Sequence, residues 1–186
     1  MRVKLAVVLC VIILLCGCSN QDDALGRAVA LRNKITGSSG CSFSVTVTAD
    51  YGDKLYVFSS NCVTDRNGDL SFEVTSPLTI AGITGKVSGN GGAICFDDVS
   101  LAFPTIADGQ ISPVTAPWLF LKTLRGGYLK DCSNTDAGLS ISIDDSYSEE
   151  AFQIHIHTKG DAPVSAEIFW KNRRILTLVI EDFIIL

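Results

Sequence analysis

The sequence predicts an α+β fold, in which two α-helices cover an antiparallel β-sheet of about seven to ten strands. Three observations predict it. Apolar and polar residues alternate in many short segments, as they do in strands with one buried and one solvated face. Two other segments, one near the N-terminus and one in the middle of the chain, repeat apolar residues at helical spacing. Asn-Gly and glycine-rich turns join several of the strand segments as hairpins.

The N-terminal helix is expected to begin at Asp22 or Asp23, either of which can cap it, and to run to about Lys34. The central helix is expected between Ser112-Pro113 and Gly126-Gly127, although Pro117 can delay its start by a turn. The expected strands lie around these helices, at residues 42–49, 54–60, 70–75, 84–88, 93–97, 99–103, 128–132, 139–144, 151–158, 164–170 and 175–185.

Composition limits the classes of protein that the chain can represent. Its 186 residues suffice for one domain with a substantial core, and 47% hydrophobic with 19% charged residues excludes a disordered chain. The formal charge is −5 and the basic residues are scattered, which argues against a nucleic-acid partner because such a groove needs a basic stripe.

The first residues resemble an export signal. Arg2 and Lys4 precede an apolar run from Leu5 to Cys16, which is too short for a helix that needs ~20 apolar residues to cross a bilayer. The run ends in Leu15-Cys16-Gly17-Cys18, which is similar to the bacterial lipobox. We therefore expect a signal peptide at residues 1–17, a lipidated Cys18 with a short polar tether at 18–23, and a single domain at 24–186. An uncleaved anchor, with Cys18 incidental, is the alternative.

Removal of residues 1–17 would take away two of the fifteen basic residues and none of the twenty acidic ones, which leaves a formal charge of −7. An acidic body is weakly repelled by anionic lipid, so acyl chains on Cys18 would have to hold it at the membrane. The expected location is the extracytoplasmic face of a cell membrane.

Four cysteines remain beyond Cys18, and an even number in an exported chain suggests disulfides. A four-residue loop at 50–53 would place Cys41 opposite Cys62 on neighbouring strands, which predicts a Cys41–Cys62 bridge. Cys95 and Cys132 would form the remaining pair. Four buried free thiols are the alternative.

No motif predicts catalysis, a metal or a cofactor. His155 and His157 share one face of an expected strand, where a solvated face explains them without a metal, and a zinc site would need further ligands such as Asp144 or Asp145. The Asp65–Asp69 segment lacks the glutamate that closes a calcium loop and is expected to be a turn. Neither Gly-x-Ser-x-Gly nor His-Glu-x-x-His occurs. We expect a protein that is not an enzyme.

Two helices of roughly 12 residues, each ~18 Å long, can cover only part of such a sheet unless it curls around them. A curled sheet with a partial helical plug often leaves an apolar hollow, which is a common location of ligand sites. The expected lining of this cavity is Phe43, Val45, Val47, Leu70, Phe72, Trp118, Leu121 and Ile154. Ordinary core packing is the alternative for each of them.

Three segments carry a resemblance to a known family: Ser76–Gly85, Ile111-Ser112-Pro113, and Ala162–Trp170 leading into Leu176–Phe183. With the lipobox and the element order, the chain resembles the LolA/LppX-like superfamily of exported lipid carriers, and most closely its germination-lipoprotein (GerS-like) branch in spore-forming Firmicutes. The resemblance implies a strongly curved half-barrel sheet closed by helices, with acyl chains inside it in several members. For the germination branch it implies binding and activation of a cortex-processing amidase.

These expectations combine into a membrane-anchored, non-enzymatic lipoprotein that binds a lipid or another apolar ligand in the concave face of its sheet. Unlike the soluble carriers of that superfamily, a chain fixed through Cys18 can deliver only locally. The alternative is a scaffold or activator that binds a cell-wall or spore-cortex hydrolase, with residues 182–186 as a strand for edge addition.

Overall fold

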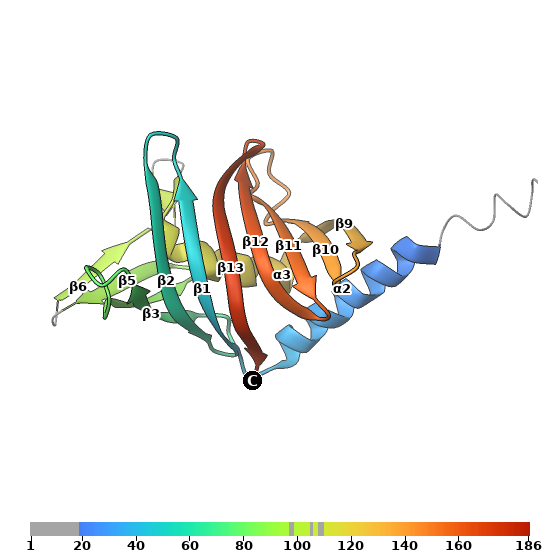
Figure 1. Cartoon of the computed structure of the whole chain (residues 1–186), viewed down its shortest axis with the longest axis horizontal. Coiled ribbons are helices and arrows are strands. Elements are labelled where there is room, and N and C mark those ends of the chain that lie inside the picture. The colour runs from blue at the N-terminus through green and yellow to red at the C-terminus, as the bar shows by residue number, and fades with distance from the viewer. Residues whose placement is uncertain (1–18, 97–98, 105, 108–109) are drawn as a thin grey trace, which may run out of the picture.

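The computed structural model describes residues 19–96, 99–104, 106–107 and 110–186, so the expected leader and Cys18 lie outside the described residues. In the described residues eleven strands form one antiparallel sheet with two helices, which confirms the α+β class (Figure 1). Each of the eleven expected segments supplies one strand of this sheet, which is one strand more than the upper figure of ten. In chain order the elements are α2 (Ser19–Gly37), β1 (Cys41–Asp50), β2 (Leu55–Thr64), β3 (Leu70–Ser76), β4 (Thr84–Ser88), β5 (Gly91–Phe96), β6 (Val99–Phe103), β7 (Ile106–Ala107), β8 (Gln110–Ile111), a 3-10 turn η1 (Pro113–Thr115), α3 (Ala116–Gly126), β9 (Tyr128–Asn134), β10 (Leu139–Asp144), β11 (Gln153–Lys159), β12 (Ala162–Trp170) and β13 (Arg173–Ile185).

The strands follow one another in the order β6-β5-β4-β3-β2-β1-β13-β12-β11-β10-β9. The chain therefore builds one half of the sheet, returns through α3, builds the other half, and closes the two with β13 against β1. Figure 1 shows the sheet curving around α3, which crosses behind its middle strands. The short pair β7–β8 lies between β6 and η1 and forms a separate two-stranded sheet.

We call the face of the sheet that packs on the helices the inner face. Along β1 the pattern alternates strictly, with Phe43, Val45 and Val47 buried and the serine and threonine side chains between them half-buried. α3 packs against β10, β12 and β13, and α2 packs against β9 and α3. The helices therefore cover the half of the sheet that runs from β1 through β13 to β9.

The central helix begins as the sequence predicts, with an adjustment for Pro117. Residues Pro113–Thr115 form a 3-10 turn, and α3 proper starts at Ala116, so that Pro117 falls in the first helical turn where its missing N–H costs nothing. α3 ends at Gly126, also as predicted. The Arg32 guanidinium of α2 donates hydrogen bonds of 2.8 Å to the carbonyl oxygens of Leu124 and Gly127, which satisfies the open end of the helix.

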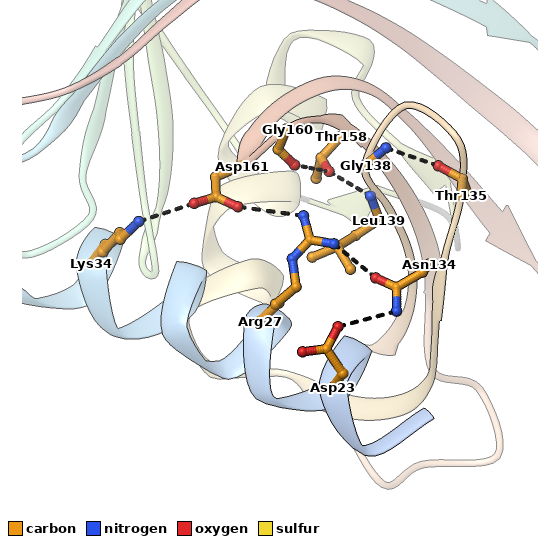
Figure 2. Close-up of polar contacts among 10 residues, drawn as sticks. All are labelled: Asp23, Arg27, Lys34, Asn134, Thr135, Gly138, Leu139, Thr158, Gly160 and Asp161. Atoms are coloured by element: carbon orange, nitrogen blue, oxygen red, sulfur yellow. Dashed lines mark hydrogen bonds and ion pairs between the residues drawn. The ribbon is translucent and has the colours of Figure 1, made fainter. Parts of the chain in front are cut away.

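α2 is longer than predicted. It begins at Ser19, so the residues expected to form a polar tether are already helical. Polar contacts fasten this helix to two hairpin turns (Figure 2). Arg27 donates to Asn134, which in turn donates to Asp23, and both Arg27 and Lys34 form ion pairs with Asp161. The N-terminal helix is therefore a fixed part of the body.

The strand register overturns the predicted disulfides. Asp50 pairs with Leu55, not Ala49 with Lys54, so Cys62 lies opposite Phe43 and is only a diagonal neighbour of Cys41. Diagonal neighbours have Cα atoms ~7–8 Å apart, beyond the usual span of a disulfide. Cys95 on β5 and Cys132 on β9 lie near opposite ends of the sheet order. All four described cysteines are free thiols, three of them buried.

The C-terminal segment is paired with another strand along one side. β13 lies between β1 and β12, and Ile185 pairs with Cys41. The backbone of Leu186 exchanges hydrogen bonds with Ser39 and Gly40 after the end of α2. The pairing of β13 with β12 ends at Val179, so in the described structure residues 182–186 have a strand partner on the β1 side only. That these residues offer a strand for edge addition stays a prediction. The terminal strands of the sheet order are β6 and β9.

Candidate functional site

The eight residues predicted to line a cavity all lie in one continuous hydrophobic core. Trp118 is the most accessible of them, with 6% of its surface exposed, and the rings of Phe43 and Phe120 meet edge to face at 6.3 Å. The side chains thus pack against one another, and the ordinary core reading describes them. Only Leu70 and Phe72 also border hollows on the surface.

Uncovered apolar surface lies farther along the same inner face, on β5 and β6. The register carries the inner face from Phe72 on β3 through Gly85 and Ile94 to Leu101, and Val99 pairs with Phe96. Phe96, Val99 and Leu101 are 51%, 69% and 67% exposed. We define the apolar strip by its five residues, Ile94, Phe96, Val99, Leu101 and Phe103.

Two glycines shape the border between the core and the apolar strip. A Cβ atom on Gly85 would lie 2.5 Å from the ring of Phe72, and one on Gly92 would lie 2.3 Å from the ring of Phe103. The rings of Phe72 and Phe103 therefore occupy the space over strand positions that carry no side chain. A side chain at either glycine would displace the ring that lies over it.

The apolar strip ends at an unprotected sheet edge. Among the described residues β6 is hydrogen-bonded to β5 alone, and Val99–Phe103 contains no charged residue and no proline. The other edge, β9, carries Lys130 and Asp131 and is covered by α2. Natural sheets blunt their free edges with charges or cover them, so an uncharged edge beside exposed apolar side chains indicates an interaction surface.

The opposite, outer face of β2–β6 has two open hollows of about 850 Å³ and 440 Å³. They share Val63, Ser71, Lys86 and Ala93 and so form one groove. The groove forms because the outer face carries small side chains here, such as those of Ser71 and Ala93. Charged residues surround it, with Lys86 beside Asp65, Asp69 and Glu73. This groove is more polar than the strip.

The remaining sequence candidates do not converge on a metal centre. His155 and His157 lie on the outer face of β11 opposite Ser142 and Ser140, and Asp144 is held by Lys130 at 2.9 Å. Within the described ranges no three His, Cys, Asp or Glu side chains gather as metal ligands. The Asp65 carboxylate accepts hydrogen bonds from the backbone N–H groups of Asn67 and Asp69, so this segment is the predicted turn.

The buried thiols are poor nucleophiles. Burial raises the pKa of Cys62 to about 12 and also raises the pKa of Cys41 and of Cys132. Because the thiolate is the reactive form, these three groups are inert at neutral pH. Cys95 is exposed on the outer face.

The sequence pattern alone did not single out Phe96, Val99 and Leu101. Alternation in 99–103 identified the strand, but a strand signal does not say whether a helix covers its apolar side. An available signal was the lack of charge in this segment, which contrasts with the other edge.

Neither helix in the described part of the chain has the length and apolarity that crossing a bilayer requires.

No protein-family model and no curated protein sequence matches the chain. Among solved structures, a putative outer membrane lipoprotein-sorting protein domain from Vibrio parahaemolyticus is similar, with a TM-score of 0.50, 5% identity, and coverage of 88% of this chain and 92% of that one. A LolA superfamily protein from Nitrosomonas europaea has a TM-score of 0.45 with 12% identity over 86% of this chain and 93% of that one. The Mycobacterium tuberculosis lipoprotein LppX has 0.41 with 15% identity over 87% and 96%. At these identities the likeness concerns the fold alone, and the chain shares the fold of the lipoprotein-sorting protein domain.

Proposed function

We propose that this protein is a membrane-anchored, extracytoplasmic lipoprotein that binds a lipid or another apolar ligand on the inner face of its sheet and is not an enzyme. The observation that carries the proposal is the apolar strip, where three large side chains of one inner face are at least half exposed. Soluble proteins rarely leave such contiguous apolar surface uncovered without a binding role.

An acyl chain suits the apolar strip because it is narrow, apolar and free of charged residues. Burial of a methylene group contributes about 0.8 kcal/mol, so a chain that buries roughly six of them would gain about 5 kcal/mol. The rings of Phe72 and Phe103, which occupy the space over Gly85 and Gly92, would offer apolar contact surface to such a chain. The apolar strip adjoins the hydrophobic core, so a bound acyl chain would extend that core along the inner face of β5 and β6.

The place of the anchor also supports this proposal. Figure 1 shows the N-terminal end of α2 and the β6 edge at opposite ends of the long axis of the molecule. Because α2 begins at Ser19 and is fixed to the body, acyl chains on Cys18 would hold the membrane at the end far from the apolar strip. The strip would then be open to a ligand that arrives from elsewhere in the envelope.

The test compares two adjacent positions of β6 in the full lipoprotein. Leu101 belongs to the apolar strip and Ser100 points to the outer face, and both are exposed. Purification under native conditions and mass spectrometry of an organic extract should recover a lipid at near-equal amount from the wild type and from Ser100→Asp. Leu101→Asp should retain at most about a tenth, because a charge in the strip would lose its water beside the ligand.

Absence of any lipid from the wild type, together with failure of a fluorescent fatty acid to bind it, would contradict the proposal. Equal recovery of lipid from Ser100→Asp and Leu101→Asp would show that the lipid binds to a surface other than the apolar strip.

The second candidate is a scaffold or activator of a cell-wall or spore-cortex hydrolase, as the germination-lipoprotein branch would imply. The unpaired, uncharged β6 edge favours it, since an extended segment of a partner can add to such an edge. In that case affinity purification of the membrane-extracted lipoprotein would recover a stoichiometric envelope hydrolase and no lipid. Ser100→Pro should reduce that recovery, because proline removes a backbone N–H from the edge strand.

A further inference from the structure

A separate polar pocket of about 280 Å³ lies on the outer face of the other half of the sheet. It faces away from the core, because its strand residues alternate with the buried Ile143, Ile154 and Ile168. The pocket is lined by Lys130, Asp144, Ser148, Glu149, Ala151, Gln153, Phe169, Lys171 and Asn172. Its volume is close to the ~300 Å³ at the lower end for small-molecule sites, so it suits a single ring.

Most charges at this pocket neutralise one another. Lys130 forms an ion pair with Asp144 at 2.9 Å, and Lys171 forms one with Glu150 at 3.1 Å. Among the charged residues that line the pocket, Glu149 is the one that these two ion pairs leave out. The pocket therefore has no surplus of positive charge to attract a phosphate or another anion.

Two planar amides at this pocket are without partners. The side chains of Gln153 and Asn172 make no hydrogen bond to any residue in the described part of the chain, and neither does the Glu149 carboxylate. Each amide both donates and accepts hydrogen bonds, and a carboxylate accepts them. Together they match a neutral ligand with several hydroxyl groups, which also donate and accept.

An aromatic ring supplies the apolar wall. Phe169 is half-buried on β12, lines the pocket, and packs against the ring of His155 at 4.7 Å between centroids. The apolar face of a sugar ring can lie against an aromatic face while its hydroxyl groups reach polar side chains at the rim.

The turn at one wall has a fixed backbone. Lys171 and Asn172 have φ values of +48° and +63°, in the left-handed region that glycine favours. Asparagine tolerates this region but lysine rarely adopts it. Both residues form the two-residue turn between β12 and β13, in which positive φ values are usual, and the ion pair of Lys171 with Glu150 from the facing loop holds the turn and the loop around the pocket.

We propose that this pocket binds a neutral sugar ring of a glycan, with Phe169 against the face of the ring and Gln153, Asn172 and Glu149 on its hydroxyl groups. The pocket lies on the face opposite to the apolar strip, so this inference is independent of the proposed lipid function.

The test titrates the full lipoprotein, held in a detergent that has no sugar headgroup, with chitotriose, maltotriose and inorganic phosphate, followed by NMR or calorimetry. A trisaccharide should bind with a Kd near ~1 mM, which corresponds to about −4 kcal/mol, and phosphate should not bind. Asn172→Gly should weaken that binding about tenfold. Its fold should be intact because glycine suits the φ at this position. Gln153→Ala should have a similar effect.

The matched control is His157→Ala, which lies on the same outer face of β11 but does not line the pocket. It should bind as the wild type does. A co-sedimentation assay with insoluble cell-wall glycan separates a polymer ligand from a free sugar, and either result supports the proposal. No binding of either trisaccharide, equal binding by Asn172→Gly and the wild type, or binding of phosphate in their place would overturn it.

Discussion

Single residues on the two faces of the sheet differ in what their side chains can do. Cys62 on the inner face has a pKa raised to about 12 by burial, whereas Cys95 on the outer face is exposed. The same alternation separates Leu101 of the apolar strip from Ser100 beside it. In a strand, a shift of one position changes the environment completely, which is why adjacent substitutions serve as matched controls.

The thiols give a prediction at this scale. In the native lipoprotein at pH 8, one thiol, that of Cys95, should react with a maleimide within minutes, while Cys41, Cys62 and Cys132 should react only after addition of urea. Mass spectrometry counts the labels. The count should fall to zero in native Cys95→Ser. If unreduced protein in urea takes up fewer than four labels, bridges exist and the free-thiol arrangement is wrong.

At the scale of elements, α2 is held by polar contacts with the β9–β10 and β11–β12 turns. The Lys34 ammonium donates a hydrogen bond to Asp161 and lies beside it as a positive charge, and together with Arg27 it lowers the pKa of Asp161. A carboxylate with a lowered pKa stabilises the fold above its unfolded pKa of ~3.9 and loses that contribution as the pH falls through the folded value.

Asp161→Asn should therefore lower the free energy of unfolding at pH 7 by about 0.5–1 kcal/mol, since the contacts are exposed and screened by solvent. The difference from the wild type should shrink towards zero as the pH falls below ~3.9 and through the lowered pKa of the folded state, and also in ~1 M salt. Urea unfolding at several pH values measures it. Asp136→Asn, an exposed carboxylate without an ion pair in the described chain, should have little effect. A pH-independent loss in Asp161→Asn would exclude the electrostatic account.

For the whole molecule, the fixed α2 links the position of the body to the expected anchor. The helix extends from Ser19 without a loop, so a membrane at Cys18 would restrict the orientation of the sheet and of the apolar strip. This orientation matters for both proposed functions, because the strip and the β6 edge would face away from the anchored end (Figure 1).

The anchor gives the prediction at this scale. Cells grown with labelled palmitate should yield a labelled wild-type protein in the membrane fraction, and Cys18→Ala should be unlabelled because it lacks the acceptor thiol. The matched control is Cys16→Ala, which keeps Cys18 and places a small residue in the lipobox, and it should be labelled as the wild type is. A membrane-bound, unlabelled wild type would instead indicate an uncleaved hydrophobic anchor.

Elements with strong local signals could be predicted from the sequence. Alternation in 42–49 and 139–144, the Asn67-Gly68 turn, and the Pro and Gly boundaries of α3 are all found where they were expected. The exact register could not be predicted, because a shift of one residue in the β1–β2 loop moved Cys62 from opposite Cys41 to opposite Phe43. The disulfide prediction failed for this reason.

The sequence by itself determined the alternation of apolar and polar side chains, and with it the strands, their two faces and the apolar composition of both β1 and β6. Only the tertiary structure decided which of those apolar faces is core and which is surface. α3 is short and crosses the middle of a long curved sheet, so Val45 and Val47 are buried in the core that the helices and the sheet share, while Val99 and Leu101, with the same pattern, are left exposed. Local periodicity sets the direction of a side chain, but burial depends on what long-range packing places in front of it.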